Sequence, residues 1–204
     1  MSGKPWQMWS RSDNRTLAAA LGLALLLVGL SGVLLPILRV TGALPPAHIR
    51  KVELHDVTRS PAVIASGGAS LRGTRAGELA FTHPDLTERL LLVLPGVTRA
   101  LLLLVILELL RRMVRSLRDG DVFIAQNTRR LGVIAVAVLV LATLIPLVDT
   151  VTTALLVSGT QLSSKVPIAY ELSGPYVLLA LLLAAAAEAF RQGTRLRADT
   201  EGLV

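Results

Sequence analysis

The stretch LLLLVILELLRRMVRSLRD, residues 101–119, decides the class of this chain, and its charge pattern occurs again in LLLAAAAEAFRQGTRLRAD, residues 181–199. Each stretch has a glutamate at the end of an apolar run, arginines three and seven residues after it and an aspartate eleven residues after it, and the two patterns are 80 residues apart, since 188 minus 108 is 80. The charged residues are Glu108, Arg111, Arg115 and Asp119 in the first copy and Glu188, Arg191, Arg195 and Asp199 in the second. Long apolar runs that end in arginines are typical of membrane-spanning helices at their cytoplasmic ends.

The composition supports the same class. Hydrophobic residues make up 52% of the 204 positions and the mean hydropathy is +0.62, which exceeds the usual value for a soluble domain of this size. We therefore expect one membrane domain over residues 1–204. The chain has no cysteine, so disulfides and thiolate metal sites are excluded. The net charge of +7 is divided among short segments between apolar runs, which indicates membrane topology and no direct nucleic-acid binding.

Four apolar runs are expected to cross the membrane as helices, because backbone groups inside hydrocarbon can be satisfied only within the helix itself. The second helix is expected to begin with a capping box, in which Asp85 and Glu88 bond each other's backbone N–H groups, and to bend at Pro95. Pro175 is expected in the first turn of the fourth helix. The predicted helices are 17–38, 86–118, 124–149 and 175–195. The fold class is thus an all-α membrane protein.

The repeated pattern suggests that the four helices form two similar hairpins. VLLPILRV, residues 33–40, resembles TLIPLVDT, residues 143–150, and this alignment places Arg39 opposite Asp149. An internal repeat related by an axis along the membrane normal would let these two side chains pair at the outer ends of their helices. The alternative is chance similarity, because proline and arginine are common near helix ends.

The distribution of basic residues predicts the orientation. One side carries Lys4, Arg11, Arg15, Arg111, Arg112, Arg115, Arg118, Arg129, Arg130, Arg191, Arg195 and Arg197. On the other side, the basic residues of the loop 41–84 are balanced by acidic ones, and the last loop has only Lys165. Both termini and the arginine-rich loop 111–130 are therefore expected to be cytoplasmic, in a multi-pass protein of the cell membrane. Arg99 is then expected near the outer interface.

The extracytoplasmic loop 41–84 is expected to contain one or two small β-hairpins. KVELHDV and RAGELAFTH alternate apolar and polar residues, and SGGASLRG between them reads as a turn. The loop also contains His48, His55 and His83, but their spacing matches no zinc motif. Its serines are not part of a nucleophile elbow. We therefore predict no metal, no cofactor and no enzymatic activity.

The segment RRMVRSLRDGDVFIAQNTRRLG, residues 111–132, is the most specific part of the sequence. It predicts a basic stripe on a helix that leaves the bilayer, a helix end at Gly120, and a rising helix through Asn127 and Arg130. Glu108 and Glu188 lie about one turn inside the inner boundary. Each is expected to bond the arginine three or four residues further on, or to reach the other glutamate's helix. The alternative role is a proton or substrate relay.

The pattern GDVF-x3-N-x-RRL, residues 120–131, together with AEAFRQGTRLRADTEGLV, residues 187–204, resembles the domain-of-unknown-function 2975 family of bacterial four-helix membrane proteins. Family members typically have Gly-Asp-Pro-Phe at the turn, so Val122 replaces the usual proline here, while Gly120, Asp121, Phe123 and Asn127 are kept. The resemblance covers the whole chain in outline and is strongest from Glu108 to Val204. It implies no catalytic residues. It does imply a neighbouring gene for a small helix-turn-helix transcription regulator.

Two functions from different classes follow. The first is an interaction protein whose cytoplasmic face docks a helix-turn-helix transcription regulator. The alternative is a small transporter or export component that acts as a dimer and uses Glu108, Glu188 and Arg99. Anionic lipids of the bilayer are expected partners in both cases. The candidate docking or anchoring residues are Glu108, Arg111, Arg115, Gly120, Asp121, Phe123, Asn127, Arg130, Glu188, Arg191 and Arg195.

Overall fold

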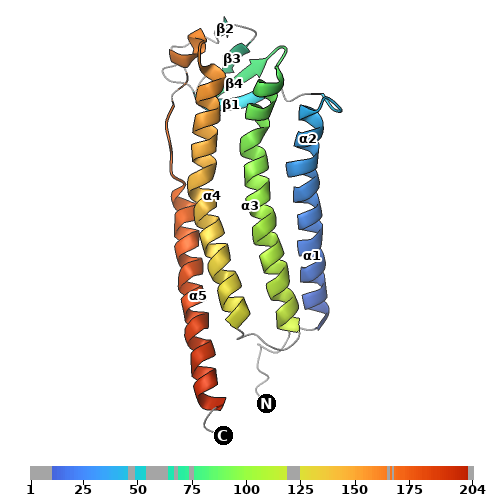
Figure 1. Ribbon diagram of the computed structural model, residues 1–204, viewed down its shortest axis with the longest axis vertical. Coiled ribbons are helices and arrows are strands. Elements are labelled where there is room, and N and C mark those ends of the chain that lie inside the picture. The colour runs from blue at the N-terminus through green and yellow to red at the C-terminus, as the bar shows by residue number, and fades with distance from the viewer. Residues whose placement is uncertain are drawn as a thin grey trace, which may run out of the picture. The chain divides into compact units, whose positions relative to one another are not determined.

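The computed structural model describes residues 11–45, 49–53, 64–66, 69–73, 76–118, 125–164, 166 and 168–201. The elements in chain order are α1 (Arg11–Gly29), the π-helical segment η2 (Leu30–Leu34), α2 (Leu35–Val40), β1 (Ile49–Glu53), β2 (Ile64–Ser66), β3 (Ala69–Gly73), β4 (Ala76–Phe81), α3 (Leu86–Arg118), α4 (Ala125–Val157), the 3₁₀ segment η3 (Gln161–Ser164) and α5 (Gly174–Glu201) (Figure 1). The chain divides into two compact units. The first comprises Met1–Leu30, Ala100–Ala142 and Ser173–Val204, and the second comprises Ser31–Arg99 and Thr143–Leu172.

Within the described residues, four helical stretches are long and apolar enough to cross a membrane: Thr16–Val40, Leu86–Ser116, Gln126–Val157 and Gly174–Arg195. Their outward faces carry large apolar side chains, such as Leu26 with 62% of its surface exposed, Val136 with 61% and Leu181 with 62%. Water would disfavour so much exposed apolar surface, whereas lipid tails accept it. These helices mark a multi-pass membrane protein, as the sequence indicated.

The helix boundaries agree closely with the sequence for α3 and differ for the others. Predicted and observed limits of α3 are the same, 86–118. The first helix was predicted at 17–38. In the structure it is longer and runs from Arg11 to Val40, with the π-helical segment η2 just before Pro36. A wider π turn accommodates a proline that has no N–H to donate. The predicted 175–195 becomes Gly174–Glu201, with Pro175 in the first turn as expected.

Helix α4 extends to Val157 instead of ending at residue 149, so the predicted end of this helix was wrong. The sequence suggested an end at the charged Asp149, but the threonines that follow continue the helix. Thr152 Oγ1 lies 2.7 Å from the carbonyl oxygen of Val148, and Thr153 Oγ1 donates a hydrogen bond of 2.7 Å to the carbonyl oxygen of Asp149. Leu156 and Val157 in the added turns are buried, and this burial stabilises the extension.

The second unit contains a four-stranded antiparallel sheet in the order β1-β4-β3-β2. The sequence predicted strands in KVELHDV and RAGELAFTH. β4 confirms the second, and β1 confirms the first as far as Glu53, since residues 54–57 lie outside the described residues. It was wrong about SGGASLRG, because Ala69–Gly73 forms β3 and pairs with both β2 and β4. A run of small and polar residues resembles a turn when it is read alone, but backbone pairing on both edges decides its structure here.

The core of the second unit lies where one face of the sheet meets the end of α4. Val52 on β1 and Leu79 and Phe81 on β4 are buried in one cluster with Leu156, Val157, Leu162 and Val166, and Leu91 and Leu92 of α3 pack against it. Alternate strand residues face the same side of a sheet, which explains why Leu79 and Phe81 are buried together. The last turns of α4 therefore cover the sheet.

The core of the first unit is formed by three helices. Ile134 and Val138 of α4 and Ala180 of α5 are buried together, and α3 contributes Ile106, Leu109, Leu110 and Met113 to their surroundings. Their recurrence at spacings of three and four places each set on one helix face. Helices α3, α4 and α5 thus share one apolar core in this unit.

The predicted capping box of α3 is confirmed. The Glu88 N–H donates to Asp85 Oδ1 over 2.7 Å, and the Asp85 N–H donates to Glu88 Oε2 over 2.9 Å. These two bonds satisfy N–H groups that a helix start leaves without partners. The capping box fixes where α3 begins.

We expect Asp85→Ala to lower the free energy of unfolding by about 1 kcal/mol, because the Glu88 N–H loses its acceptor. Asp85→Asn keeps a carbonyl oxygen at the same place and should cost much less. Denaturant unfolding of the purified protein in detergent measures both values. Equal losses for the two variants would show that this cap does not stabilise α3.

Candidate functional site

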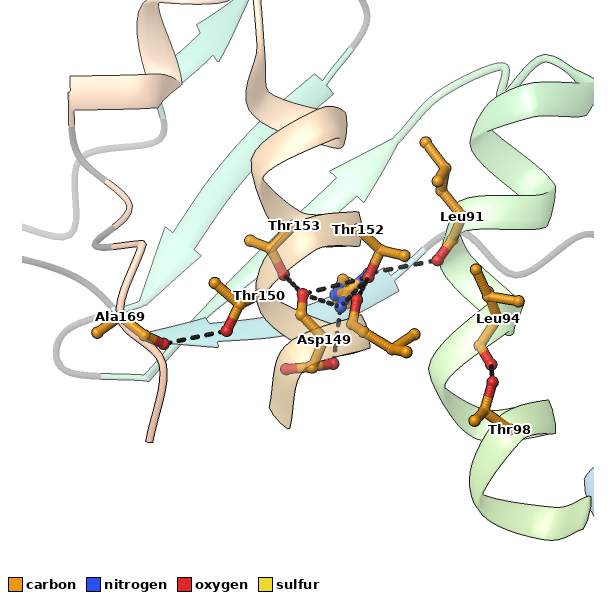
Figure 2. A network of polar contacts seen from close by, with 10 residues as sticks. Leu91, Leu94, Thr98, Asp149, Thr150, Thr152, Thr153 and Ala169 are labelled. Atoms are coloured by element: carbon orange, nitrogen blue, oxygen red, sulfur yellow. Dashed lines mark hydrogen bonds and ion pairs between the residues drawn. The ribbon is translucent and has the colours of Figure 1, made fainter. Parts of the chain in front are cut away.

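Arg50 of β1 is a buried charged residue that links the sheet to two helices. Only 8% of its side-chain surface is exposed. Its Nη2 lies 2.7 Å from Asp149 Oδ1, 2.9 Å from the Asp149 carbonyl oxygen and 2.8 Å from Thr152 Oγ1, all on α4. Its Nη1 donates a bond of 3.3 Å to the carbonyl oxygen of Leu91 on α3. Figure 2 shows these bonds meeting between Leu91 and Asp149.

The bond to Leu91 compensates for a proline in α3. In a regular helix the Leu91 carbonyl would accept the N–H of residue 95, but Pro95 has none. Arg50 supplies the missing donor from another element. A carbonyl in a largely apolar setting without any donor would be costly, so Pro95 makes Arg50 more important.

The electrostatic balance at Arg50 has two opposing parts. Burial lowers the pKa of the Arg50 guanidinium, and the neighbouring Asp149 carboxylate counteracts that shift. Asp149 keeps 57% of its side-chain surface exposed, so it stays in contact with the surroundings while it neutralises Arg50. The pair therefore holds a charge inside the unit without leaving it unpaired.

The alignment of the two hairpins predicted that Asp149 pairs with Arg39, but its partner in the structure is Arg50. Arg39 lies in the last turn of α2 and is exposed, and it forms no ion pair with Asp149 among the described residues. Sequence reasoning missed Arg50 because it appeared to be one of several loop cations. Arg50 shares a strand face with the apolar Val52, but a single arginine in a short polar segment gives little signal of burial, and only Pro95 indicates that a donor is needed.

A cavity of about 340 Å³ adjoins this network in the second unit. Its wall combines four charged residues, two threonines and an apolar side. The lining residues are Lys51, Val52, Arg99, Ile145, Pro146, Asp149, Thr150, Thr153, Val166, Ile168, Ala169 and Glu171. Two hydrogen bonds hold the segment after η3 against α4: Thr150 Oγ1 to the Ala169 carbonyl at 3.1 Å, and Tyr170 Oη to the Thr143 carbonyl at 3.2 Å.

In the first unit, the two repeated glutamates bind arginines of their own helices, as predicted. Glu108 Oε2 lies 2.7 Å from Arg111 Nη2, and Glu108 Oε1 lies 2.9 Å from Arg112 Nε. Glu188 Oε1 lies 2.8 Å from Arg191 Nη2, and Gln192 takes the place that Arg112 has in the first copy. These contacts neutralise both carboxylates near the ends of the spans.

The buried side chain of Asn127 links the end of α3 to the start of α4 by hydrogen bonds. It is 2% exposed, and its Oδ1 lies 2.8 Å from Ser116 Oγ and 3.1 Å from Arg130 Nη1. Arg130 Nη1 also donates to the Arg112 carbonyl oxygen over 3.2 Å. The asparagine and arginine of the sequence pattern thus have a physical role, because they fix the end of α3 against the start of α4.

The remaining predicted residues of this region form no ion pair among the described residues or lie outside them. Arg115 and Arg195 are exposed, and neither forms an ion pair within the described part of the chain. Gly120, Asp121 and Phe123 lie outside the described residues, as do His48 and His55 of the loop. Among the residues that were described, no group of three or more His, Cys, Asp and Glu side chains is arranged to hold a metal ion.

The fold defines a multi-pass membrane protein with two polar regions. One is the Arg50 network of the sheet-containing unit. The other is the arginine-rich helix junction, formed by residues 111–118 of α3 and 125–130 of α4. The family model described as "Protein of unknown function (DUF2975)" matches residues 74–204, and the chain belongs to this family. The match begins before β4 and includes α3, α4 and α5. No curated protein and no solved structure matches the chain.

The role of Arg50 can be tested by a double-mutant cycle with Pro95. We expect Arg50→Met to lower the free energy of unfolding by about 2 kcal/mol, because it removes charged hydrogen bonds and leaves the Leu91 carbonyl unpaired. In Pro95→Ala the N–H of residue 95 can bond that carbonyl, so the loss caused by Arg50→Met should shrink by about 1 kcal/mol.

Unfolding in detergent measures the four proteins of the cycle, with Lys51→Met as the control for removing a cation from an exposed position of the same strand. If the loss of unfolding free energy in the double variant equals the sum of the two single losses to within about 0.5 kcal/mol, the coupling between Arg50 and Pro95 is contradicted.

Proposed function

We propose that this protein is a membrane-bound partner of a cytoplasmic helix-turn-helix transcription regulator, which it holds at the membrane through its arginine-rich helix junction. Both termini and residues 111–130 are cytoplasmic in this proposal, because basic residues concentrate there. The regulator is proposed from the resemblance described above, which implies a neighbouring gene for such a protein.

The fixed geometry of the Asn127 junction is the observation that carries the proposal. Ser116, Asn127 and Arg130 join α3 to α4 through two partly buried side-chain bonds and one exposed bond to the Arg112 carbonyl oxygen, so these helix ends are held against each other. Arg115 and Arg129 on the same two helices are exposed and form no ion pair within the described ranges. Guanidinium groups on a rigid surface lose little entropy when they bind carboxylates, which favours an acidic surface of a protein partner.

The membrane arrangement is proposed as two hairpins with a common origin. The ion pair from Glu108 to Arg111 and that from Glu188 to Arg191 have the same spacing and nearly the same length, 2.7 and 2.8 Å. These matching contacts support an internal repeat. A difference also exists, since Pro95 lies inside α3 while Pro175 lies in the first turn of α5.

The alternative function, a dimeric transporter or export component, has less support. A relay needs a carboxylate that can exchange protons or substrate, but Glu108 and Glu188 are each held by a neighbouring arginine. These ion pairs favour anchoring of helix ends. The charged cavity of the second unit is a better candidate for a ligand.

The orientation can be tested directly because the chain has no cysteine that would react in the background. We expect a membrane-impermeant maleimide to label Lys51→Cys in intact cells and to label Arg129→Cys only after permeabilisation. Both positions are exposed in the structure, so accessibility within the fold does not limit the reaction. Labelling of Arg129→Cys in intact cells would reverse the topology.

Capture of the regulator can be tested by pull-down from detergent with the helix-turn-helix protein encoded beside this one. We expect the double variant Arg115→Glu, Arg129→Glu to weaken capture about ten-fold, because the new carboxylates then face an acidic surface of the same charge. Deletion of residues 193–204 should weaken it as well, since this tail carries Asp199, Glu201 and an apolar end.

The matched control is Arg39→Glu with Lys51→Glu, which reverses two exposed charges on the side that we place outside. Equal loss in both double variants would contradict a specific docking surface. Unchanged capture by the shortened chain would exclude the tail from it.

A further inference from the structure

We propose that the cavity of the second unit binds a small zwitterion, a molecule with an amine at one end and a phosphate or carboxylate at the other. This inference goes beyond regulator docking and uses residues from the other unit of the chain. The cavity holds about 340 Å³, which lies near the lower end of the range for small-molecule sites.

Arg99 is the strongest reason to expect a bound anion. It lies within the apolar span Leu86–Ser116, between LPGVT and ALLLLVI, and it lines the cavity. The described residues offer its guanidinium no ion pair or side-chain hydrogen bond. Arg99 is exposed in the structure, so its guanidinium is accessible to an anion at the cavity wall, and a charged residue of a spanning helix with no protein partner is a candidate functional position.

The charges of the cavity wall do not cancel. Asp149 is neutralised by Arg50, which lies 2.7 Å away. Lys51 and Arg99 then remain as cations and Glu171 as an anion, and these three have no ion pair in the part of the chain that the structure describes. A ligand with one anionic and one cationic end would satisfy both signs. Arginine is well suited to the anionic end, since its planar group binds carboxylate or phosphate with two parallel bonds.

The cavity is also preformed and partly apolar. The segment containing Ala169 and Tyr170 is tied to α4 by two hydrogen bonds, one of which is visible between Thr150 and Ala169 in Figure 2. Ile145, Val166 and Ile168 supply an apolar side, while Thr150 and Thr153 add hydroxyls. A short aliphatic link between the two charged ends of a zwitterion fits such a wall, whereas a bare inorganic ion would leave it without contacts.

The ligand chemistry can be tested with three probes on the purified full-length protein in an uncharged detergent. The probes are O-phosphoethanolamine, which carries both charges, inorganic phosphate and ethanolamine. Calorimetric titration should show that O-phosphoethanolamine binds about ten-fold or more tightly than either half, because each end gains a charged contact. Equal affinity for phosphate and O-phosphoethanolamine would overturn the proposal.

Two substitutions assign the ends of the ligand. Arg99→Gln should weaken binding of O-phosphoethanolamine and phosphate alike, by about ten-fold. Glu171→Gln should reduce the preference for O-phosphoethanolamine over phosphate and leave phosphate binding nearly unchanged. Arg39→Gln is the control, an exposed arginine of the same unit that is not part of the cavity wall. Loss of binding in Arg39→Gln equal to that in Arg99→Gln would contradict the assignment.

The same chemistry can come from a free metabolite or from a lipid headgroup. Dihexanoyl phosphatidylethanolamine, a soluble short-chain lipid, separates the two sources. Tighter binding of this lipid than of O-phosphoethanolamine, lost in Arg99→Gln, identifies a lipid headgroup as the ligand. Tighter binding of O-phosphoethanolamine identifies a soluble zwitterion. Failure of both compounds to bind would reject the site, and this result would not bear on capture of the regulator.

Discussion

The guanidinium of Arg50 joins the sheet of the second unit to α3 and α4, and several other features depend on it. It neutralises Asp149 on α4 and donates to the Leu91 carbonyl of α3 that Pro95 leaves without a partner. Without this residue, one helix would contain an unpaired carboxylate and the other an unpaired carbonyl. By neutralising Asp149, Arg50 also leaves the cavity beside it with an excess of positive charge.

The carboxylates of the two units are neutralised in different ways. In the first unit, Glu108 and Glu188 are neutralised by arginines of their own helices, three or four residues away. Such pairs form within one helix and require no tertiary packing. In the second unit, Asp149 is neutralised by a residue 99 positions distant in sequence. The first arrangement anchors helix ends, whereas the second holds together elements from distant parts of the chain.

Much of the fold could be predicted from the sequence, but the site could be predicted only in part. Periodicity, a capping box and flanking charges gave the exact limits of α3, and the glutamate anchors followed from helical spacing alone. The end of α4 was misjudged at Asp149, because a charge near a membrane boundary usually stops an apolar run. What carries α4 on to Val157 is its burial against the sheet, together with hydroxyl bonds from Thr152 and Thr153. Neither influence is visible in a one-dimensional pattern.

The sequence by itself determined the class of this protein, its four spans and the family to which it belongs, because apolar length and local charge spacing are properties of neighbouring residues. The tertiary structure alone decided that Arg50, and not Arg39, pairs with Asp149. It also decided that ASLRG is a strand and that Arg99 lines a cavity with Glu171. These features depend on contacts between distant segments, which are set by strand pairing and by the burial of polar groups.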